Sequence, residues 1–175
     1  MRAELADKRG HGRYSLSPAS LLSLDAGTRL VLPSPNGSAL SLATAATPTL
    51  TGCFRNCRSV ALAAMRYGRR IAVIPAGEQW PDHSLRPSFE DWVGAGAIIS
   101  HLKGHWSPEA KLAVAAYQGI RSSLKNLMLQ CSSGKELIAR GYEQDVELAA
   151  EVNVSDCVPM LREGAYVRDN RSESS

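Results

Sequence analysis

The chain has 175 residues, of which 44% are hydrophobic, so one sizeable core in a single domain is expected. Its 20 Lys and Arg against 17 Asp and Glu give a net charge of +3, too weak to predict a nucleic-acid or membrane-binding surface. No apolar run approaches the roughly 20 residues of a membrane span, and the start MRAELADKRGHGR has no signal-peptide core, so a cytoplasmic protein with reduced cysteines is expected.

Strand-like and helix-like segments alternate along the sequence. The pattern of apolar residues predicts strands at 29–32, 48–51 and 70–74. It predicts helices at 37–45, 56–67 and 88–102, and further helices that begin at Ser107 and Ser133. A closing hairpin is predicted from 158–161 and 165–167. Strands covered by helices indicate a single α/β domain over residues 1–168, followed by a polar, disordered tail at 169–175.

The helix predicted at 88–102 carries two further signals. Ser88 and Asp91 have the spacing of a capping box. Gly94 and Gly96 lie in the middle of the helix, where glycine costs up to about 1 kcal/mol relative to alanine. The sequence therefore predicts that this helix packs very closely, and we expect it to lie against the sheet.

Each predicted strand is followed by a polar loop. These loops are SPNGS at 34–38, GCFRNC at 52–57, and a long one over 75–91. In an α/β fold such loops can meet at one edge of the sheet. Together they carry side chains suited to a phosphate and a metal ion: Asn36, Ser38, Arg55, Asn56, Glu78, Arg86, Glu90 and Asp91.

Two explanations of these loops remain open. Each loop can be a plain turn or helix cap, because Asn-Gly pairs and capping Asn and Asp residues are common. Alternatively, the arginines and amides bind the oxygens of a phosphate, while carboxylates bind Mg²⁺. The second combination is typical of metal-assisted phosphoryl transfer to water. Other chemistries lack their motifs, since the sequence has no P-loop, no GxSxG and no cysteine-phosphatase loop.

The same stretches resemble a known family. SPNGSAL, GCFRNC, PAGE, SFEDWVGAGAII and SGKELIARGYEQDVELAAEVNVSDCVPML, taken in order from about Ser15 to Val167, are similar to 2-phosphosulfolactate phosphatases. The resemblance implies a Mg²⁺-dependent, three-layer α/β/α phosphatase with a mixed sheet. Such an enzyme converts 2-phospho-3-sulfolactate to 3-sulfolactate and phosphate, a step towards coenzyme M.

The resemblance also assigns roles to residues. Asn36, Gly37 and Ser38 fall on the family's Asn-Gly-Thr turn, and Asn56 falls on its Asn after the second strand. Glu90 and Asp91 fall on its Glu-Asp pair, which implies metal ligands and catalytic residues. With Glu78 as a further catalytic candidate and Arg55 and Arg86 as substrate-binding candidates, this set completes the predicted site.

One part of the family pattern has no counterpart in this sequence. Family members begin with a further strand and helix that carry an Asp-x-x-Arg-Ala motif, and nothing here matches it. The domain is therefore expected to be N-terminally incomplete relative to the family, with an exposed sheet edge through which a homodimer could form. Two readings stay open: a phosphatase of small phosphate monoesters, or a non-catalytic anion-binding or regulatory module, which includes an inactive fragment of the enzyme.

Overall fold

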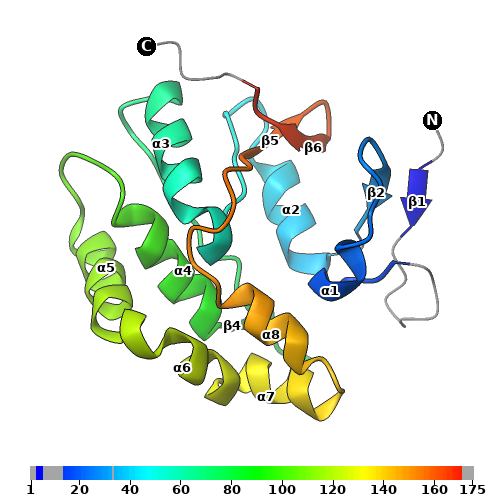
Figure 1. Cartoon of the computed structure of the whole chain (residues 1–175). Helices are drawn as coiled ribbons and strands as arrows, with labels where there is room; N and C mark the ends of the chain where they lie inside the picture. The colour runs from blue at the N-terminus through cyan, green and yellow to red at the C-terminus, as the bar shows by residue number, and fades with distance from the viewer. Residues whose placement is uncertain (1–2, 6–13, 33, 171–175) are drawn as a thin grey trace.

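Helices dominate the fold (Figure 1). The structure, a computed structural model, describes residues 3–5, 14–32 and 34–170. The α-helices are α1 (Pro18–Leu21), α2 (Pro35–Ala43), α3 (Cys57–Tyr67), α4 (Phe89–Ile99), α5 (Pro108–Ile120), α6 (Leu124–Gln130), α7 (Ser132–Ala139) and α8 (Glu143–Ala149). Short 3₁₀ turns, η1 (Phe54–Asn56) and η2 (Arg121–Ser123), precede α3 and α6. Within these residues, no helix has the length and apolar character that crossing a bilayer requires.

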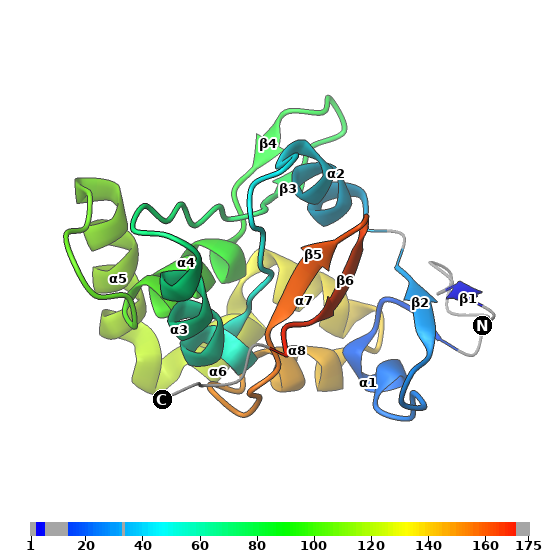
Figure 2. The same ribbon diagram turned by 90° about the horizontal axis from the view of Figure 1, so that it is seen from above.

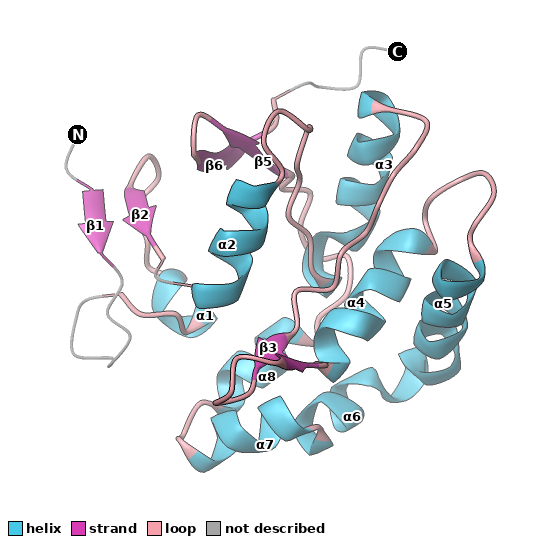
Figure 3. Ribbon diagram, turned by 180° about the vertical axis from the view of Figure 1, so that it is seen from behind, coloured by secondary structure: helices cyan, strands magenta, loops and turns pink. Residues whose placement is uncertain are grey.

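The strands form three separate pairs. They are β1 (Ala3–Leu5), β2 (Arg29–Val31), β3 (Glu78–Gln79), β4 (Leu85–Arg86), β5 (Pro159–Arg162) and β6 (Ala165–Arg168). β1 and β2 are parallel, while β3–β4 and β5–β6 are antiparallel. Figure 3 shows these pairs, in magenta, at three different places around the helices. The chain is therefore a mixed helix-and-strand fold, but the predicted single mixed sheet between two helical layers is not confirmed.

Of the strands predicted at 48–51 and 70–74, the first is reduced to a single antiparallel bridge and the second is wrong. Residues 70–74 run without a strand partner among the described residues, and Ile74 is 64% exposed. Residues 49–51 do pair with β5: Leu50 bridges Met160, the Thr51 N–H donates to the Pro159 carbonyl at 3.1 Å, and the Thr49 carbonyl accepts the Leu161 N–H at 2.9 Å. The strand at 70–74 was predicted from the β-forming composition of RRIAVI, but a strand also needs a partner with free backbone groups. The predicted homodimer through an exposed edge stays a prediction.

The main core lies among helices. Its buried side chains come from η1, α3, α4, α5, α6 and α8: Phe54, Cys57, Ala61, Val93, Ala97, Ile98, Tyr117, Leu124, Met128, Val146 and Ala150. Figure 2 shows α3 and α4 side by side, with α5 beyond α4. All four cysteines are free, as the sequence predicted.

Gly96 explains why α4 and α5 pack so closely. A Cβ atom on Gly96 would lie 2.0 Å from the Ala113 carbonyl oxygen of α5, whereas one on Gly94 would have nothing nearer than Phe54 Cζ at 3.9 Å. The predicted close packing is confirmed at Gly96. The predicted partner is wrong, because α4 packs against a helix rather than a sheet.

Several element boundaries agree with the sequence. Ser107 caps α5, since its Oγ accepts the Ala110 N–H at 3.3 Å. Gly68 ends α3, and the β5–β6 hairpin turns at Glu163-Gly164. Ser133 is not the cap of α7, because that helix begins at Ser132 and Cys131 caps it.

The C-terminal boundary differs from the predicted one. Asp169, expected in the disordered tail, is buried, and its main-chain N–H donates to the Val158 carbonyl at 2.8 Å. Its carboxylate pairs with Arg66 and Arg162. The domain thus includes Asp169, while 171–175 lie outside the described residues, as does most of 1–13.

Candidate functional site

A short hairpin, β3–β4, places two predicted site residues next to each other. Glu78 and Arg86 are directly paired across the antiparallel strands. Gly77, just before β3, has a φ of +66°, which L side chains rarely adopt. Gly77 itself is buried, whereas Glu78, the next residue, is exposed.

The first turns of α2 and α4 hold Gly77 from both sides. Asn36 Nδ2, in the first turn of α2, donates to the Gly77 carbonyl at 3.2 Å and to Glu78 Oε2 at 3.0 Å. Asp91 Oδ2, in the first turn of α4, accepts the Gly77 N–H at 2.9 Å. Residues far apart in the sequence therefore fix the position of Glu78.

Glu90 faces the start of α7. Its Oε2 lies 3.9 Å from Cys131 Sγ, which also donates to the Met128 carbonyl at 3.1 Å. Burial raises the pKa of the Cys131 thiol, and the charge of Glu90 raises it further. Cys131 is thus a neutral thiol near pH 7, which argues against a cysteine nucleophile here.

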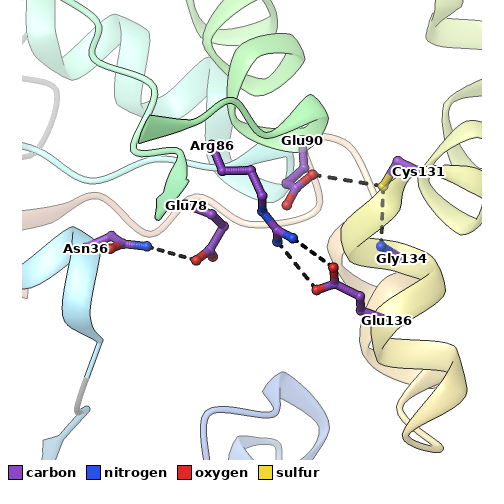
Figure 4. Close-up of polar contacts among 7 residues, drawn as sticks. All are labelled: Asn36, Glu78, Arg86, Glu90, Cys131, Gly134 and Glu136. Atoms are coloured by element: carbon purple, nitrogen blue, oxygen red, sulfur yellow. Dashed lines mark hydrogen bonds and ion pairs between the residues drawn. The ribbon is translucent and has the colours of Figure 1, made fainter. Parts of the chain in front are cut away.

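Arg86 forms a two-pronged ion pair with Glu136 of α7. Nη1 donates to Oε1 at 2.8 Å and Nη2 to Oε2 at 3.4 Å. The guanidinium also lies over the Trp80 ring, 5.4 Å from its centroid. Figure 4 shows Arg86 reaching across to Glu136, with Glu78 and Glu90 on either side.

Carboxylates outnumber the guanidinium at this place. The hydrogen bond to Glu136 raises the pKa of Arg86, and the charges of Glu136, Glu78 and Glu90 raise it further. The pKa of Asp91 is raised chiefly by burial, then by Glu90 and Glu78, while the Gly77 N–H opposes the shift. The cluster therefore has an excess of negative charge, which a bound cation would neutralise.

The donor types fit Mg²⁺. Glu78, Glu90 and Asp91 offer hard carboxylate oxygens, and Mg²⁺ usually takes one or two such groups together with water and a substrate phosphate. Within the part of the chain that the structure describes, no three Asp, Glu, His or Cys side chains come together as a ready-made metal cage. The assignment of Glu90 and Asp91 as magnesium ligands stays a prediction.

The segment predicted to form the Asn-Gly-Ser turn is helical. Asn36, Gly37 and Ser38 lie in the first turn of α2, after Ser34. Ser38 Oγ donates to the Ser34 carbonyl, and a Cβ atom added at Gly37 would lie 3.3 Å from Ser34 Oγ. Asn36 alone of the three is tied to the carboxylate cluster by a hydrogen bond in this structure; a role of Gly37 and Ser38 in substrate binding stays a prediction.

Arg55 and Asn56 lie in a different region. Arg55 donates to the Leu148 carbonyl at 2.9 Å and pairs with Glu151, both near the end of α8. Asn56 is buried: its Oδ1 accepts the Cys53 N–H at 2.8 Å and its Nδ2 donates to the Cys157 carbonyl at 2.9 Å. These contacts fix loops, and the structure does not bring either residue to the Glu78–Arg86 hairpin.

The predicted capping box at Ser88 is wrong. Ser88 precedes α4 but its side chain makes no capping hydrogen bond, and its buried Oγ has no partner among the described residues. Asp91 does not serve its own helix either, because its carboxylate binds the Gly77 N–H instead. Burial and tertiary contact override the local pattern here.

Sequence reasoning missed the contribution of α7. The sequence predicts a helix that begins at Ser133, but it assigns no site residue to that helix. The 3.6-residue periodicity places Glu136 on a helix but gives no sign of a partner fifty residues earlier. The one available signal in the sequence was that Trp80 and Arg86 lie in the same predicted loop, where an arginine can stack on a tryptophan ring.

The comparisons with known proteins point to one family. The sequence profile described as 2-phosphosulpholactate phosphatase matches residues 12–164. The chain is 31% identical over 138 residues to the 2-phosphosulfolactate phosphatase of Methanothermobacter thermautotrophicus, covering 79% of this chain and 58% of that protein. It is 27% identical over 143 residues to the 2-phosphosulfolactate phosphatase of Methanocaldococcus jannaschii, covering 82% of this chain and 58% of that protein.

The chain thus spans less than two thirds of the length of these relatives. The matched part nevertheless includes every residue of the candidate site. The chain therefore belongs to the 2-phosphosulpholactate phosphatase family.

Proposed function

We propose that this chain is a Mg²⁺-dependent phosphatase that hydrolyses a small phosphate monoester, 2-phospho-3-sulfolactate, to 3-sulfolactate and phosphate. One observation carries the proposal. Asn36, Glu78, Arg86, Glu90 and Asp91, selected from the sequence for phosphate and metal chemistry, meet around Gly77 and the β3–β4 hairpin. The relatives of the same family carry this substrate in their names.

Arg86 is the group suited to bind the phosphate. A guanidinium has five N–H groups, and the two prongs to Glu136 use one on each Nη. The remaining N–H groups take part in no hydrogen bond among the described residues, so they can donate hydrogen bonds to two phosphate oxygens. The Trp80 ring covers one face of the guanidinium, 5.4 Å from ring centroid to Cζ.

The carboxylates supply the rest of the chemistry. Glu90 and Asp91 would hold Mg²⁺, which supplies a positive charge for the phosphate oxygens and lowers the pKa of a bound water. Glu78, which accepts a hydrogen bond from Asn36, would accept a proton from the attacking water. The oxygen of that water bonds to phosphorus, the bond between phosphorus and the sulfolactate oxygen breaks, and the departing oxygen takes up a proton from solvent.

Because phosphate and carboxylates repel, the site needs the cation. The charges of Glu78, Glu90 and Glu136 all act on Arg86, and those of Glu78 and Glu90 also act on Asp91, so phosphate alone would meet several negative charges here. Substrate binding should therefore depend on Mg²⁺. The four free cysteines agree with a reducing, cytoplasmic location, and the substrate places the reaction on the route to coenzyme M.

The test is phosphate release from 2-phosphosulfolactate by the full chain, with Mg²⁺ and with EDTA. The matched control is Glu90→Gln purified in the same way, which removes one carboxylate charge and excludes a contaminating phosphatase. We expect Mg²⁺-dependent turnover by the wild type and a large loss in the variant. Tight phosphate binding without turnover would instead assign the chain to the non-catalytic, anion-binding class.

A further inference from the structure

We propose that Glu136 is a positioning residue, which holds Arg86 in the orientation that binds phosphate. This inference rests on the proposed function, because it concerns the same arginine. Glu136 lies on α7, an element that contributes none of the predicted site residues. Its carboxylate accepts hydrogen bonds from both terminal nitrogens of Arg86, at 2.8 and 3.4 Å.

Glu136 could in principle compete with the phosphate instead of helping it. The geometry favours positioning. Glu136 occupies only the end of the guanidinium, so the edge formed by Nε and one Nη remains available to a phosphate. Arg86 can therefore hold Glu136 and a phosphate at the same time, and losing Glu136 would leave its long side chain free to sample other rotamers.

Arg86 needs such a partner because of its position. It lies on β4, which has two residues and pairs only with the two residues of β3, so few ladder hydrogen bonds hold the backbone around it. Its side chain is 20% exposed. Trp80, its stacking partner, is on the same hairpin and 50% exposed, so Glu136 is the contact that ties Arg86 to the helical body.

The start of α7 is itself firmly placed, which makes Glu136 a suitable anchor. A Cβ atom on Gly134 would lie 1.9 Å from the Met128 carbonyl oxygen, so α7 begins in direct contact with α6. Cys131 Sγ accepts the Gly134 N–H at 3.4 Å and donates to the Met128 carbonyl at 3.1 Å. Figure 4 shows Gly134 between Cys131 and Glu136 at this end of the helix.

The experiment measures inorganic phosphate binding in the presence of Mg²⁺, by calorimetry, alongside the steady-state constants for hydrolysis. The variants are Glu136→Ala, Glu136→Asp and Arg86→Ala. Glu147→Ala is the matched control, because Glu147 also pairs with a cation at 2.8 Å and has the same exposed fraction, 47%.

We expect Glu136→Ala to weaken phosphate binding roughly 10-fold, by analogy with the low end of the loss at metal sites when the partner of a metal-binding residue is removed. KM should rise more than kcat falls, Glu136→Asp should recover part of the loss, and Glu147→Ala should bind like the wild type. Wild-type phosphate affinity in a folded Glu136→Ala protein, together with a loss in Arg86→Ala, would overturn the inference. So would phosphate affinity that does not depend on Arg86.

The two proposals fail in different ways. If the wild type binds phosphate through Arg86 and Glu136 but releases none from the ester, the phosphatase proposal fails and the positioning role stands. If the ester is hydrolysed equally by wild type and Glu136→Ala, the positioning role fails and the phosphatase proposal stands.

Discussion

Asn36 and Asp91 hold opposite sides of the same residue. The Asn36 amide donates to the Gly77 carbonyl at 3.2 Å, and the Asp91 carboxylate accepts the Gly77 N–H at 2.9 Å. Asn36 lies in the first turn of α2 and Asp91 in the first turn of α4, so the loop that carries Glu78 is fixed by two helices. The site is thus positioned by helix starts rather than by the ends of a sheet.

Asn36→Asp tests this arrangement. The change removes the Nδ2 donor from the Gly77 carbonyl and places a second carboxylate next to Glu78. We expect a loss of about 1 kcal/mol in the free energy of unfolding, from an unmade hydrogen bond and like-charge repulsion. Urea denaturation measures it. Asn126→Asp is the control, since Asn126 is exposed and offers only its Oδ1 to Gln130, so a change under about 0.5 kcal/mol is expected. Equal effects in the two variants would show that Asn36 is no anchor.

Asp91→Asn should separate stability from activity. In the folded protein the pKa of Asp91 is raised by burial and by Glu90, so the folded state binds more protons than the unfolded state just above pH 3.8. Wild-type stability should therefore fall, relative to the variant, as pH rises through that window. The variant keeps an oxygen for the Gly77 N–H. Hydrolysis should nevertheless fall roughly 10- to 100-fold, because the proposed metal ligand loses its negative charge.

Asp82→Asn provides the control of opposite sign. The pKa of Asp82 is lowered by its hydrogen bonds from Ser84, so this carboxylate stabilises the protein at neutral pH and loses that effect in acid. Urea unfolding at pH 3.5 and pH 7 should give opposite pH trends for the two substitutions. Parallel trends would contradict the burial of charge at Asp91.

Local signals were sufficient for most of the helices. Ser107-Pro108 begins α5, Gly68 ends α3, and Glu163-Gly164 turns the closing hairpin. These features depend on residues close in sequence, so capping and turn chemistry decide them. The capping box at Ser88 failed because Asp91 found a better-placed partner in Gly77.

Long-range pairing was beyond local signals. RRIAVI has the composition of a strand, but no described segment offers it a ladder, and Ile74 remains exposed. Within the site, the choice of Glu78, Arg86, Glu90 and Asp91 followed from residue type and family resemblance. Their convergence with Glu136 depends on how α7 packs, which no pattern within one segment encodes.

Gly96→Ala should be costly because of the contact between α4 and α5. The new methyl would lie 2.0 Å from the Ala113 oxygen, so the helices must separate. We expect a loss of about 1–3 kcal/mol, which corresponds to a melting temperature several degrees lower. Gly94→Ala is the control: its methyl has ordinary contact with Phe54 at 3.9 Å, and helix propensity should make it neutral or stabilising. The same melting temperature in both variants would contradict this packing.

Gly134→Ala tests whether the position of α7 matters to the site as well as to the fold. A methyl there would meet the Met128 carbonyl oxygen at 1.9 Å, and the strain would shift the start of α7 and with it Glu136. We expect about 1–3 kcal/mol of destabilisation and, at temperatures where the variant is still folded, weaker phosphate binding. Gly119→Ala is the matched control, because Gly119 lies in α5 with nothing within 4 Å of the added methyl. That variant should gain about 0.5–1 kcal/mol and bind phosphate like the wild type. If Gly134→Ala lost stability but kept full phosphate affinity, α7 would be a structural neighbour of Arg86 and no part of the site.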